Sequence, residues 1–273
     1  MPLTNVQAWS TANSGTGTGS VSVSWGSART SGNLLVLVYT CDAVFTVPSG
    51  WTSAVRALDY SDMRIMYRIA DNTSTDAPTI TPSAASCMAW AEYSGNTATP
   101  LDQTASGTNN TVTGATTRAT GTTAATSQAD ELAVAAWYWS GPTGYTGGAH
   151  WSGQTNSYAE QTDDGTSKGS GANVGLCVAT VDLAAAAATS STASITLIGT
   201  ASQNGLGGAV ATFKAAAAGG ATRGMPFGPR GTAFNGGRTF KGPMFLRPEP
   251  VHLSRKGRRA WRDYRDISAG AKA

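Results

Sequence analysis

The stretch Ser86–Gly95, SCMAWAEYSG, predicts a central strand of a β-sandwich that runs directly into a tight turn. Alternate residues of a strand point to opposite faces of its sheet. One face would carry Cys87, Ala89, Ala91 and Tyr93, and the other Met88, Trp90 and Glu92. Both faces are mainly apolar, so we expect a strand that is covered on both sides. Ser94 and Gly95 are turn residues that would release the chain to the surface.

Two further segments have the same character. Leu34–Thr40, LLVLVYT, is almost continuously apolar, and Glu131–Ser140, ELAVAAWYWS, predicts another strong strand. Shorter apolar or alternating segments lie at Val21–Trp25, Met63–Ile69, Thr79–Thr81, Ala172–Leu183, Ala193–Thr200 and Gly208–Lys214. Val47–Trp51, VPSGW, is typical of a turn that returns Trp51 to the core. About a dozen short strands without a βαβ pattern predict an all-β fold, an antiparallel β-sandwich of jelly-roll type.

Three segments of small or polar residues have weaker patterns. Thr11–Ser20 is rich in Gly, Ser and Thr, which predicts a loop. Ala98–Gln128 is either an irregular excursion or a hairpin with weak strands near Val112 and Thr117–Thr122, and its composition leaves both open. The five alanines Ala184–Ala188 are too few for an isolated helix, so we expect them to bridge two strands.

Charge and composition divide the chain into two parts. Charged residues make up only 13% of the whole. Residues 1–218 carry seven Lys and Arg against thirteen Asp and Glu, whereas residues 219–273 carry twelve against three, which gives net formal charges of −6 and +9. The composition changes abruptly at Ala215–Gly220, AAAAGG. We therefore expect a β-sandwich body over residues 1–218 and an extended, basic, Gly/Pro/Arg-rich C-terminal arm over residues 219–273.

The expected arm combines aromatic and basic side chains. Gly224–Pro250 holds too many Gly and Pro residues for a long helix or a central strand, but its spaced phenylalanines would suit anchors in pockets of a neighbour. Ser254–Ser268 is compatible with a short basic terminal helix. The candidate contact residues are Phe227, Arg230, Phe234, Arg238, Phe240, Phe245, Arg258, Arg259, Trp261 and Tyr264.

Nucleic acid competes with protein as the partner of this arm, because a net charge of +9 attracts phosphate. Two features favour protein. Glycine and proline accompany phenylalanine in the first half, and Asp263 and Asp266 lie among the terminal arginines, where a dedicated phosphate binder would avoid them. Arginine pairs well with carboxylates, and the acidic body of an adjacent copy could supply these.

No catalytic, cofactor or metal site is expected from the motifs. The three cysteines lie in apolar runs without the spacing of a zinc site, which predicts buried small side chains; they are Cys41, Cys87 and Cys177. Glu160, Asp163 and Asp164 form the best acidic cluster, but their spacing differs from that of an EF-hand, so we expect a solvated turn. Gly165–Gly169, GTSKG, matches G-x-S-x-G without the apolar strand and the helix of a nucleophile elbow.

Four aromatic residues form a candidate glycan platform. Trp137 and Trp139 fall on one face of the expected strand Glu131–Ser140, and Tyr145 and Trp151 follow it. If these rings faced solvent, they could stack on sugar rings of a host-surface glycan. A core position is the favoured alternative, because indole rings bury a large apolar area.

The motifs also carry a family resemblance. The run AEYSG (Ala91–Gly95) followed by Pro100-Leu101-Asp102, with VPSGW upstream and ELAVAA (Glu131–Ala136) downstream, resembles a β-sandwich domain of tailed-bacteriophage virion proteins, often labelled minor tail protein. The resemblance covers roughly the first three-quarters of the chain and carries no catalytic residues. It implies a non-enzymatic structural component of the virion, in the tail or tail tip.

The expected location and partners rest on the N-terminal sequence, on the hydropathy of the chain and on this resemblance. The first residues, MPLTNVQAWS, lack the basic and apolar regions of a secretory signal, and no run approaches the roughly 20 apolar residues of a membrane span. We expect synthesis in the host bacterial cytoplasm and incorporation into the virion, with other tail or capsid subunits and further copies of the chain as partners. Capsid decoration and, from a different class, a carbohydrate-binding module are the alternatives.

Overall fold

The computed structural model describes residues 1–14, 19–59, 61–107, 116–141, 151–166, 173–195 and 205–217. The chain divides into two units, Met1–Thr222 and Arg223–Ala273. The second unit lies wholly outside the described residues, and so does every candidate contact residue of the expected arm. The boundary between body and arm therefore stays a prediction.

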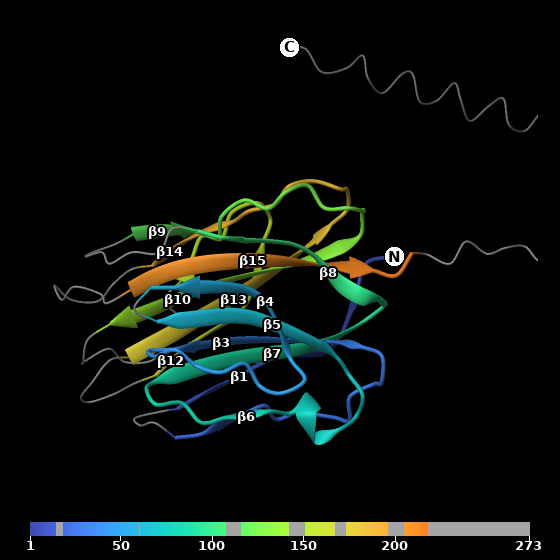
Figure 1. Cartoon of the computed structure of the whole chain (residues 1–273). Coiled ribbons are helices and arrows are strands. Elements are labelled where there is room, and N and C mark those ends of the chain that lie inside the picture. The colour runs from blue at the N-terminus through green and yellow to red at the C-terminus, as the bar shows by residue number, and fades with distance from the viewer. Residues whose placement is uncertain are drawn as a thin grey trace, which may run out of the picture. The chain divides into compact units, whose positions relative to one another are not determined.

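Two five-stranded antiparallel sheets pack face to face in the first unit (Figure 1). The first sheet has the order β1 (Thr4–Asn13), β7 (Ser86–Ser94), β3 (Leu34–Cys41), β5 (Asp62–Ile69) and β4 (Thr52–Leu58). The second has the order β12 (Ala159–Gly165), β13 (Asn173–Leu183), β10 (Glu131–Gly141), β15 (Gly205–Ala215) and β8 (Asn96–Ser106). The predicted all-β, antiparallel sandwich is confirmed.

Two smaller layers cover the outer faces of these sheets. The ribbon of β2 (Val21–Ser22) and β6 (Thr79–Ile80) packs with loop residues on the outer face of the first sheet. The three-stranded sheet of β11 (Trp151–Ser152), β14 (Thr192–Ile195) and β9 (Thr116–Ala119) packs on the second. One 3₁₀ turn, η1 (Ser74–Asp76), follows β5. Each main sheet is thus buried on both faces over most of its area.

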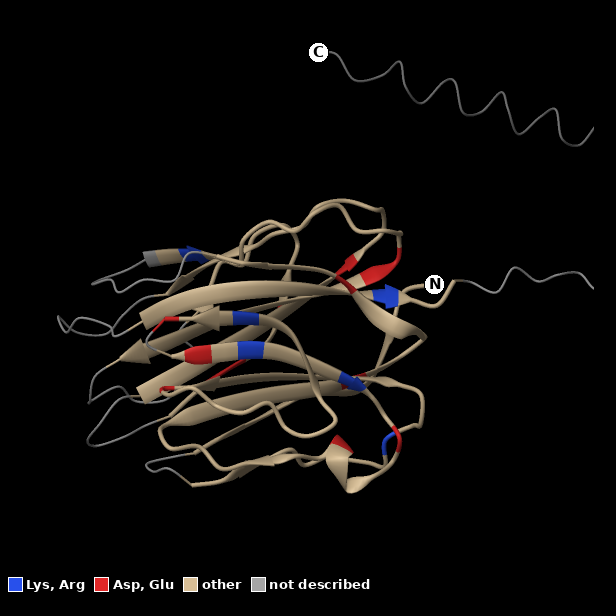
Figure 2. Cartoon of the chain, viewed as in Figure 1, with Lys and Arg blue, Asp and Glu red and all other residues tan. Residues whose placement is uncertain are grey.

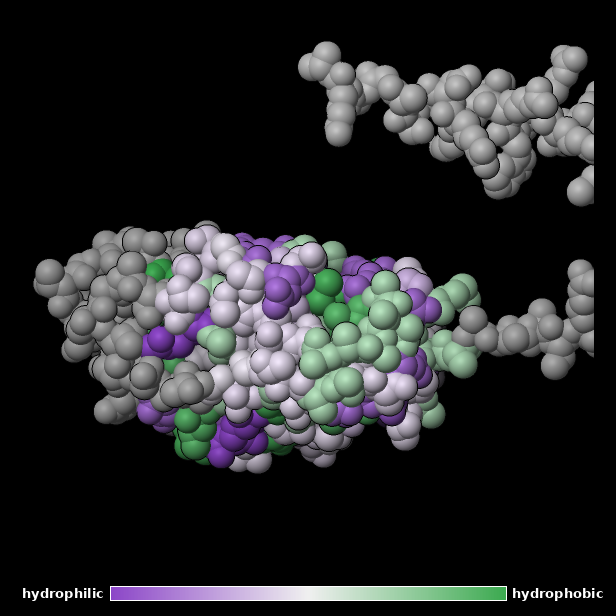
Figure 3. Space-filling model, turned by 90° about the horizontal axis from the view of Figure 1, so that it is seen from above, coloured by the Kyte–Doolittle hydropathy of each residue, from purple (hydrophilic) through white to green (hydrophobic). Residues whose placement is uncertain are grey.

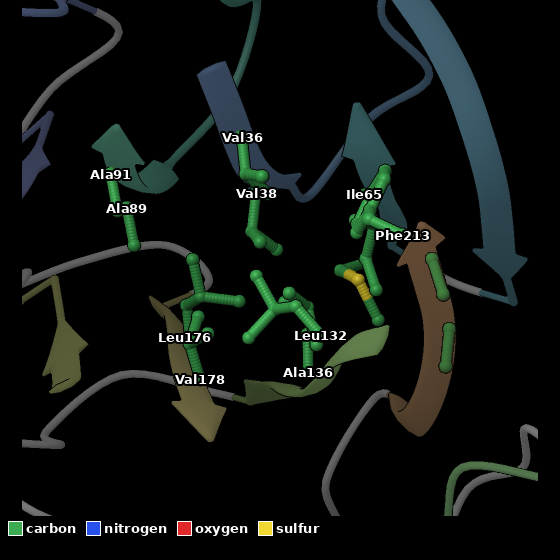
Figure 4. Close-up of a cluster of buried hydrophobic side chains, with 14 of the residues drawn as sticks. Val36, Val38, Ile65, Ala89, Ala91, Leu132, Ala136, Leu176, Val178 and Phe213 are labelled. Atoms are coloured by element: carbon green, nitrogen blue, oxygen red, sulfur yellow. The ribbon is translucent and has the colours of Figure 1, made fainter. Parts of the chain in front are cut away.

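The two faces of β7 lie as the alternation predicts. Cys87, Ala89, Ala91 and Tyr93 belong to the core between the main sheets, and Met88 and Trp90 to the core beneath the β2–β6 ribbon. β7 lies between β1 and β3, and every residue of β3 is buried. Figure 4 shows side chains of both main sheets meeting in the central core, with Val36, Val38 and Ile65 opposite Leu132 and Leu176.

The turn before β4 also has the predicted form. Gly50 has φ of +79°, a left-handed conformation that glycine adopts without strain. The Trp51 amide donates to the Pro48 carbonyl at 3.1 Å, and the Trp51 indole N–H donates to the Thr75 carbonyl at 2.8 Å. The turn returns Trp51 to the outer core of the first sheet.

Several segments differ from the sequence-based expectation. Ala98–Ser106 belongs to the long strand β8 and is no irregular excursion, because it pairs with β15 far along the chain. Of the alternative hairpin, only the weak strand near Thr117 is found, as β9, and it pairs with β14 and not with a strand near Val112, which lies outside the described residues. Thr11–Asn13 ends β1 and is not loop. Ala184–Ala188 forms no strand or helix and connects β13 to β14, as expected.

Candidate functional site

The tryptophans of the candidate glycan platform are buried. Trp137 and Trp139 have no exposed surface and Trp151 has 2%, because the β11–β14–β9 sheet covers this face of β10. The Trp137 indole N–H donates to the Arg118 carbonyl at 3.0 Å, and the Trp137 and Trp151 ring centroids lie 6.4 Å apart. The core position favoured by the sequence is therefore the observed one for these three residues. Tyr145 lies outside the described residues.

The acidic residues after Trp151 do not form a solvated turn. Glu160, Asp163 and Asp164 lie on β12, at the edge of the second sheet. Asp163 accepts a hydrogen bond from the Trp151 amide at 2.7 Å, and Asp164 accepts from the Asn13 side chain at 3.2 Å. The prediction of a turn was wrong because β12 pairs with β13. This pairing makes a strand of a polar segment that has no strand pattern of its own. Across the described ranges, no three His, Cys, Asp or Glu side chains are grouped so that they could hold a metal ion.

The three cysteines are buried and free, as expected from their apolar surroundings. Burial raises the pKa of each thiol, at Cys41, Cys87 and Cys177. A buried thiol with a raised pKa is a poor nucleophile. These side chains therefore act as small core residues.

Two buried aspartates organise the arginines of the first sheet. Both Asp62 oxygens accept from Arg56 and Arg64, at 2.8 to 3.2 Å, and Arg64 lies over the Phe45 ring at 4.8 Å from its centroid. Burial alone would raise the pKa of Asp62, but the hydrogen bonds from Arg64 and Arg56 outweigh it and lower the pKa. Asp76 likewise binds Arg68 and the Asn72 amide, each at 2.8 Å. These arginines are committed to internal carboxylates and are not a free basic surface.

Carboxylates gather at the end of the sandwich where β15 ends (Figure 2). Lys214 lies 3.9 Å from Asp102, and the N-terminal amino group lies 3.1 Å from Asp130. Partial desolvation of its carboxyl group and the charge of Asp130 raise the pKa of Asp182. Burial, with a contribution from Asp102, raises the pKa of Glu131 to about 7. Three aspartates, Asp102, Asp130 and Asp182, thus share two cations among the described residues at this end. The local potential is negative.

A hollow of about 370 Å³ opens at the side of this acidic end, between β1 and the β12–β13 pair. We call it the Asp182 hollow. Its lining residues are Leu3, Asn5, Tyr93, Leu132, Ser157, Ala159, Gln161, Thr180, Val181 and Asp182. Leu3, Tyr93 and Leu132 are buried core residues, whereas Asp182 and Gln161 are exposed. The hollow therefore has an apolar floor and a polar, acidic rim.

A second hollow, of about 460 Å³, lies between the loop after β3 and the segment that follows β6. Its lining includes Val44, Phe45, Val47, Ile80 and Pro82, but no charged side chain among the described residues. Val44 is 67% exposed there. Elsewhere, the described part of the face seen in Figure 3 is mostly near neutral, with scattered hydrophilic patches and one continuous, weakly hydrophobic area on the right of the view. Of these two hollows, the Asp182 hollow is the one that combines an apolar floor with a carboxylate.

Sequence reasoning missed the Asp182 hollow because its lining comes from five separate segments. The only local sign of the hollow in the sequence is that Asp182 stands between the apolar residues Val181 and Leu183, near the end of an apolar run. The motifs that carry the family resemblance have structural positions: VPSGW is the turn before β4, AEYSG ends β7, and ELAVAA begins β10. In the part of the chain that the structure describes, no helix is long and apolar enough to cross a membrane. No family model, curated protein or solved structure matches the chain.

Proposed function

We propose that the chain is a structural component of a tailed-phage virion, a minor tail or tail-tip protein that is attached through residues 219–273. The observation that carries the proposal is the contrast between an acidic sandwich and a basic, aromatic C-terminal sequence. The resemblance of the turn and strand motifs to phage virion domains supports a place in the virion and, within it, the preference for the tail.

The sandwich needs no further strand to close its described core. Both β10 and β15 are paired on each side, and their residues are almost all buried. Its described arginines are mostly held by internal carboxylates. The positive charge and the phenylalanines of residues 219–273 are therefore the chemistry left for binding a neighbour.

The jelly-roll type of the sandwich and the extended form of the arm are finer parts of the proposal. Pairing of β1 with β7 and of β8 with β15 joins strands far apart in the sequence, as Greek-key and jelly-roll folds do. Each main sheet nevertheless takes its strands from one half of the described chain. A jelly-roll assignment therefore has to explain why the strands of each main sheet come from one half of the described chain.

Capsid decoration is the alternative location, because an arm on a closed sandwich would suit a cement protein equally well. The burial of the tryptophans disfavours a carbohydrate-binding module. Its main support was the aromatic platform, and Trp137, Trp139 and Trp151 are buried.

Truncation after Gly220 tests the proposal. A phage that lacks the gene is complemented with either the full chain or the truncated chain, and the amount in purified particles is measured by immunoblot. We expect the truncated chain to be absent from particles, and Phe234→Ala with Phe240→Ala to weaken incorporation even at low salt. Charge reversal at Arg258 and Arg259 should instead make attachment more sensitive to salt.

The location follows from labelling the retained chain in imaged particles. Label at the tail supports a tail protein, and label over the capsid supports decoration. Full incorporation of the truncated chain would contradict attachment through residues 219–273 and would assign that role to the sandwich surface.

A further inference from the structure

The Asp182 hollow is built as a rigid receptor. Its floor residue Tyr93 is 4% exposed, and its hydroxyl accepts from the Trp9 indole at 2.8 Å. Leu132 and Leu3 complete the floor at 3% and 5% exposure. Because these side chains belong to the central core or pack at its edge, the hollow keeps its shape without a ligand.

Its size fits a single large side chain. Ligand pockets usually measure about 300–1,000 Å³, and this hollow is at the small end of that range. An apolar floor beneath Asn5, Gln161 and Asp182 suits an aromatic ring whose neighbour in sequence carries a positive charge.

Its rim has an unbalanced negative charge. Asp182 is exposed and makes no ion pair in the described parts of the chain, and Asp130 lies near enough to raise its pKa. The N-terminal amino group is bound by Asp130 and not by Asp182. A guanidinium group could therefore bind Asp182 through charge-assisted hydrogen bonds.

Residues 226–247 of the same sequence carry the complementary chemistry, with four phenylalanines and three arginines. Each phenylalanine has an arginine within four residues: Phe227 with Arg230, Phe234 and Phe240 with Arg238, and Phe245 with Arg247. Glycine and proline surround these pairs, so one ring and one guanidinium can be presented on a slender backbone.

We infer that the Asp182 hollow binds a phenylalanine–arginine segment from residues 226–247 of a second copy of the chain. The inference rests on the proposed function, in which this segment attaches the chain to a neighbour. Such a contact joins two different surfaces, and repeated contacts of this kind close into rings or extend into filaments. Either arrangement would place several copies of the chain side by side in a particle.

Photocrosslinking of the full chain tests the site and the copy together. Phe234 is replaced by the photoreactive analogue benzoylphenylalanine, and equal amounts of ¹⁴N-labelled and ¹⁵N-labelled chains are mixed and irradiated. We expect mass spectrometry to find peptides of mixed label that join position 234 to Ser157–Gln161 or to the peptide with Asp182. Crosslinks only within chains of one label would overturn the second copy as the donor. Crosslinks to the hollow beside Phe45, or none, would overturn the site.

Charge reversal on neighbouring strands supplies a matched comparison. Asp182→Lys places a positive charge at the rim and should reduce the crosslink yield about tenfold. Glu160→Lys makes the same change at an exposed residue of β12, one position from the lining residues Ala159 and Gln161 but on the opposite face. It should leave the yield nearly unchanged, and equal effects of the two variants would overturn the assignment.

Ala159→Trp tests the hollow without a change of charge. Ala159 is exposed on the edge strand β12, so a larger side chain can fill the hollow without entering the core. We expect loss of the mixed-label crosslinks with unchanged thermal stability. Failure of the inference differs from failure of the proposed function. In the first case crosslinks miss the hollow while truncated chains still fail to enter particles; in the second, truncated chains enter normally.

Discussion

The chain has few charged residues, and some of its buried carboxylates are held by ion pairs and hydrogen bonds. Asp62 binds two arginines, and Glu92 accepts from the Thr30 amide at 2.8 Å and from the Asn33 side chain at 2.7 Å. Glu131 is different. It has no exposed surface, and neither of its oxygens makes a hydrogen bond of ordinary geometry among the described residues, although Thr212 and Asp102 are neighbours. Burial therefore favours its neutral form.

Glu131 should make stability fall as the pH rises through the neutral range. Its pKa is raised from 4.5 to about 7 in the folded chain, so the folded state holds its proton more tightly than the unfolded state. The stabilisation is complete below pH 4.5 and is lost as the pH rises through 7. Glu131→Gln removes this dependence, and we expect its free energy of unfolding to change less between pH 5 and 7.5, by on the order of 1–3 kcal/mol.

Urea denaturation of both proteins at these two pH values measures the difference. Asp182, whose pKa is also raised, is present in both proteins, so the comparison isolates Glu131. Identical pH dependence in the two proteins would show that Glu131 is ionised alike in the folded and unfolded states.

At the scale of single elements, the strands that the sequence predicts most strongly are those buried on both faces. β3, β7 and β10 have apolar residues at almost every position, because each lies inside a main sheet and beneath an outer layer. β8 and β12 have polar sequences and lie at sheet edges, where the partners β15 and β13 determine their structure. Local pattern cannot reveal such long-range pairing. The Asp182 hollow was hidden for the same reason, since it exists only once β1 and β12 lie close together.

Two glycines make room for the tryptophans of β10. Gly175 on β13 lies directly opposite Trp139, and a Cβ atom at Gly175 would collide with the indole ring. Gly208 on β15 stands in the same relation to Trp137. Small residues beside large ones thus let β10 carry two indoles on one face.

Gly175→Ala should therefore destabilise the fold by about 1–3 kcal/mol, because the added methyl group overpacks a buried face. In the Trp139→Phe background the same change should cost less, since the smaller ring leaves space, and the two effects should not add. Chemical denaturation of the four proteins of this cycle measures the coupling. Gly19→Ala is the control, because a Cβ there meets no atom of the described residues within 4 Å. Strict additivity of Gly175→Ala and Trp139→Phe would contradict direct contact as the cause.

At the scale of the whole molecule, the described strands account for a closed structure. Each main sheet buries one face against the other and its second face against an outer layer. The last described strand, β15, pairs with β10 and β8, and the Ala216 amide beyond it donates to the Gly95 carbonyl at 2.6 Å. This hydrogen bond ties the end of β15 to the turn after β7, so the chain has completed both sheets by residue 217.

We therefore expect a chain that ends at Ala218 to fold without residues 219–273. Its thermal unfolding should stay cooperative, with a midpoint close to that of the full chain, because the removed residues contribute no strand to the described sheets. A chain that ends at Asn204 is the matched control: it is only 14 residues shorter but lacks β15, which is interior to its sheet and almost entirely buried. Removing it exposes one edge of β10 and separates β8 from its partner, so this shorter chain should be insoluble or unfold without a transition. Calorimetry and circular dichroism distinguish the two. Loss of cooperative unfolding in the chain that ends at Ala218 would mean that the C-terminal residues belong to the fold, and particle attachment could then no longer be their separate role.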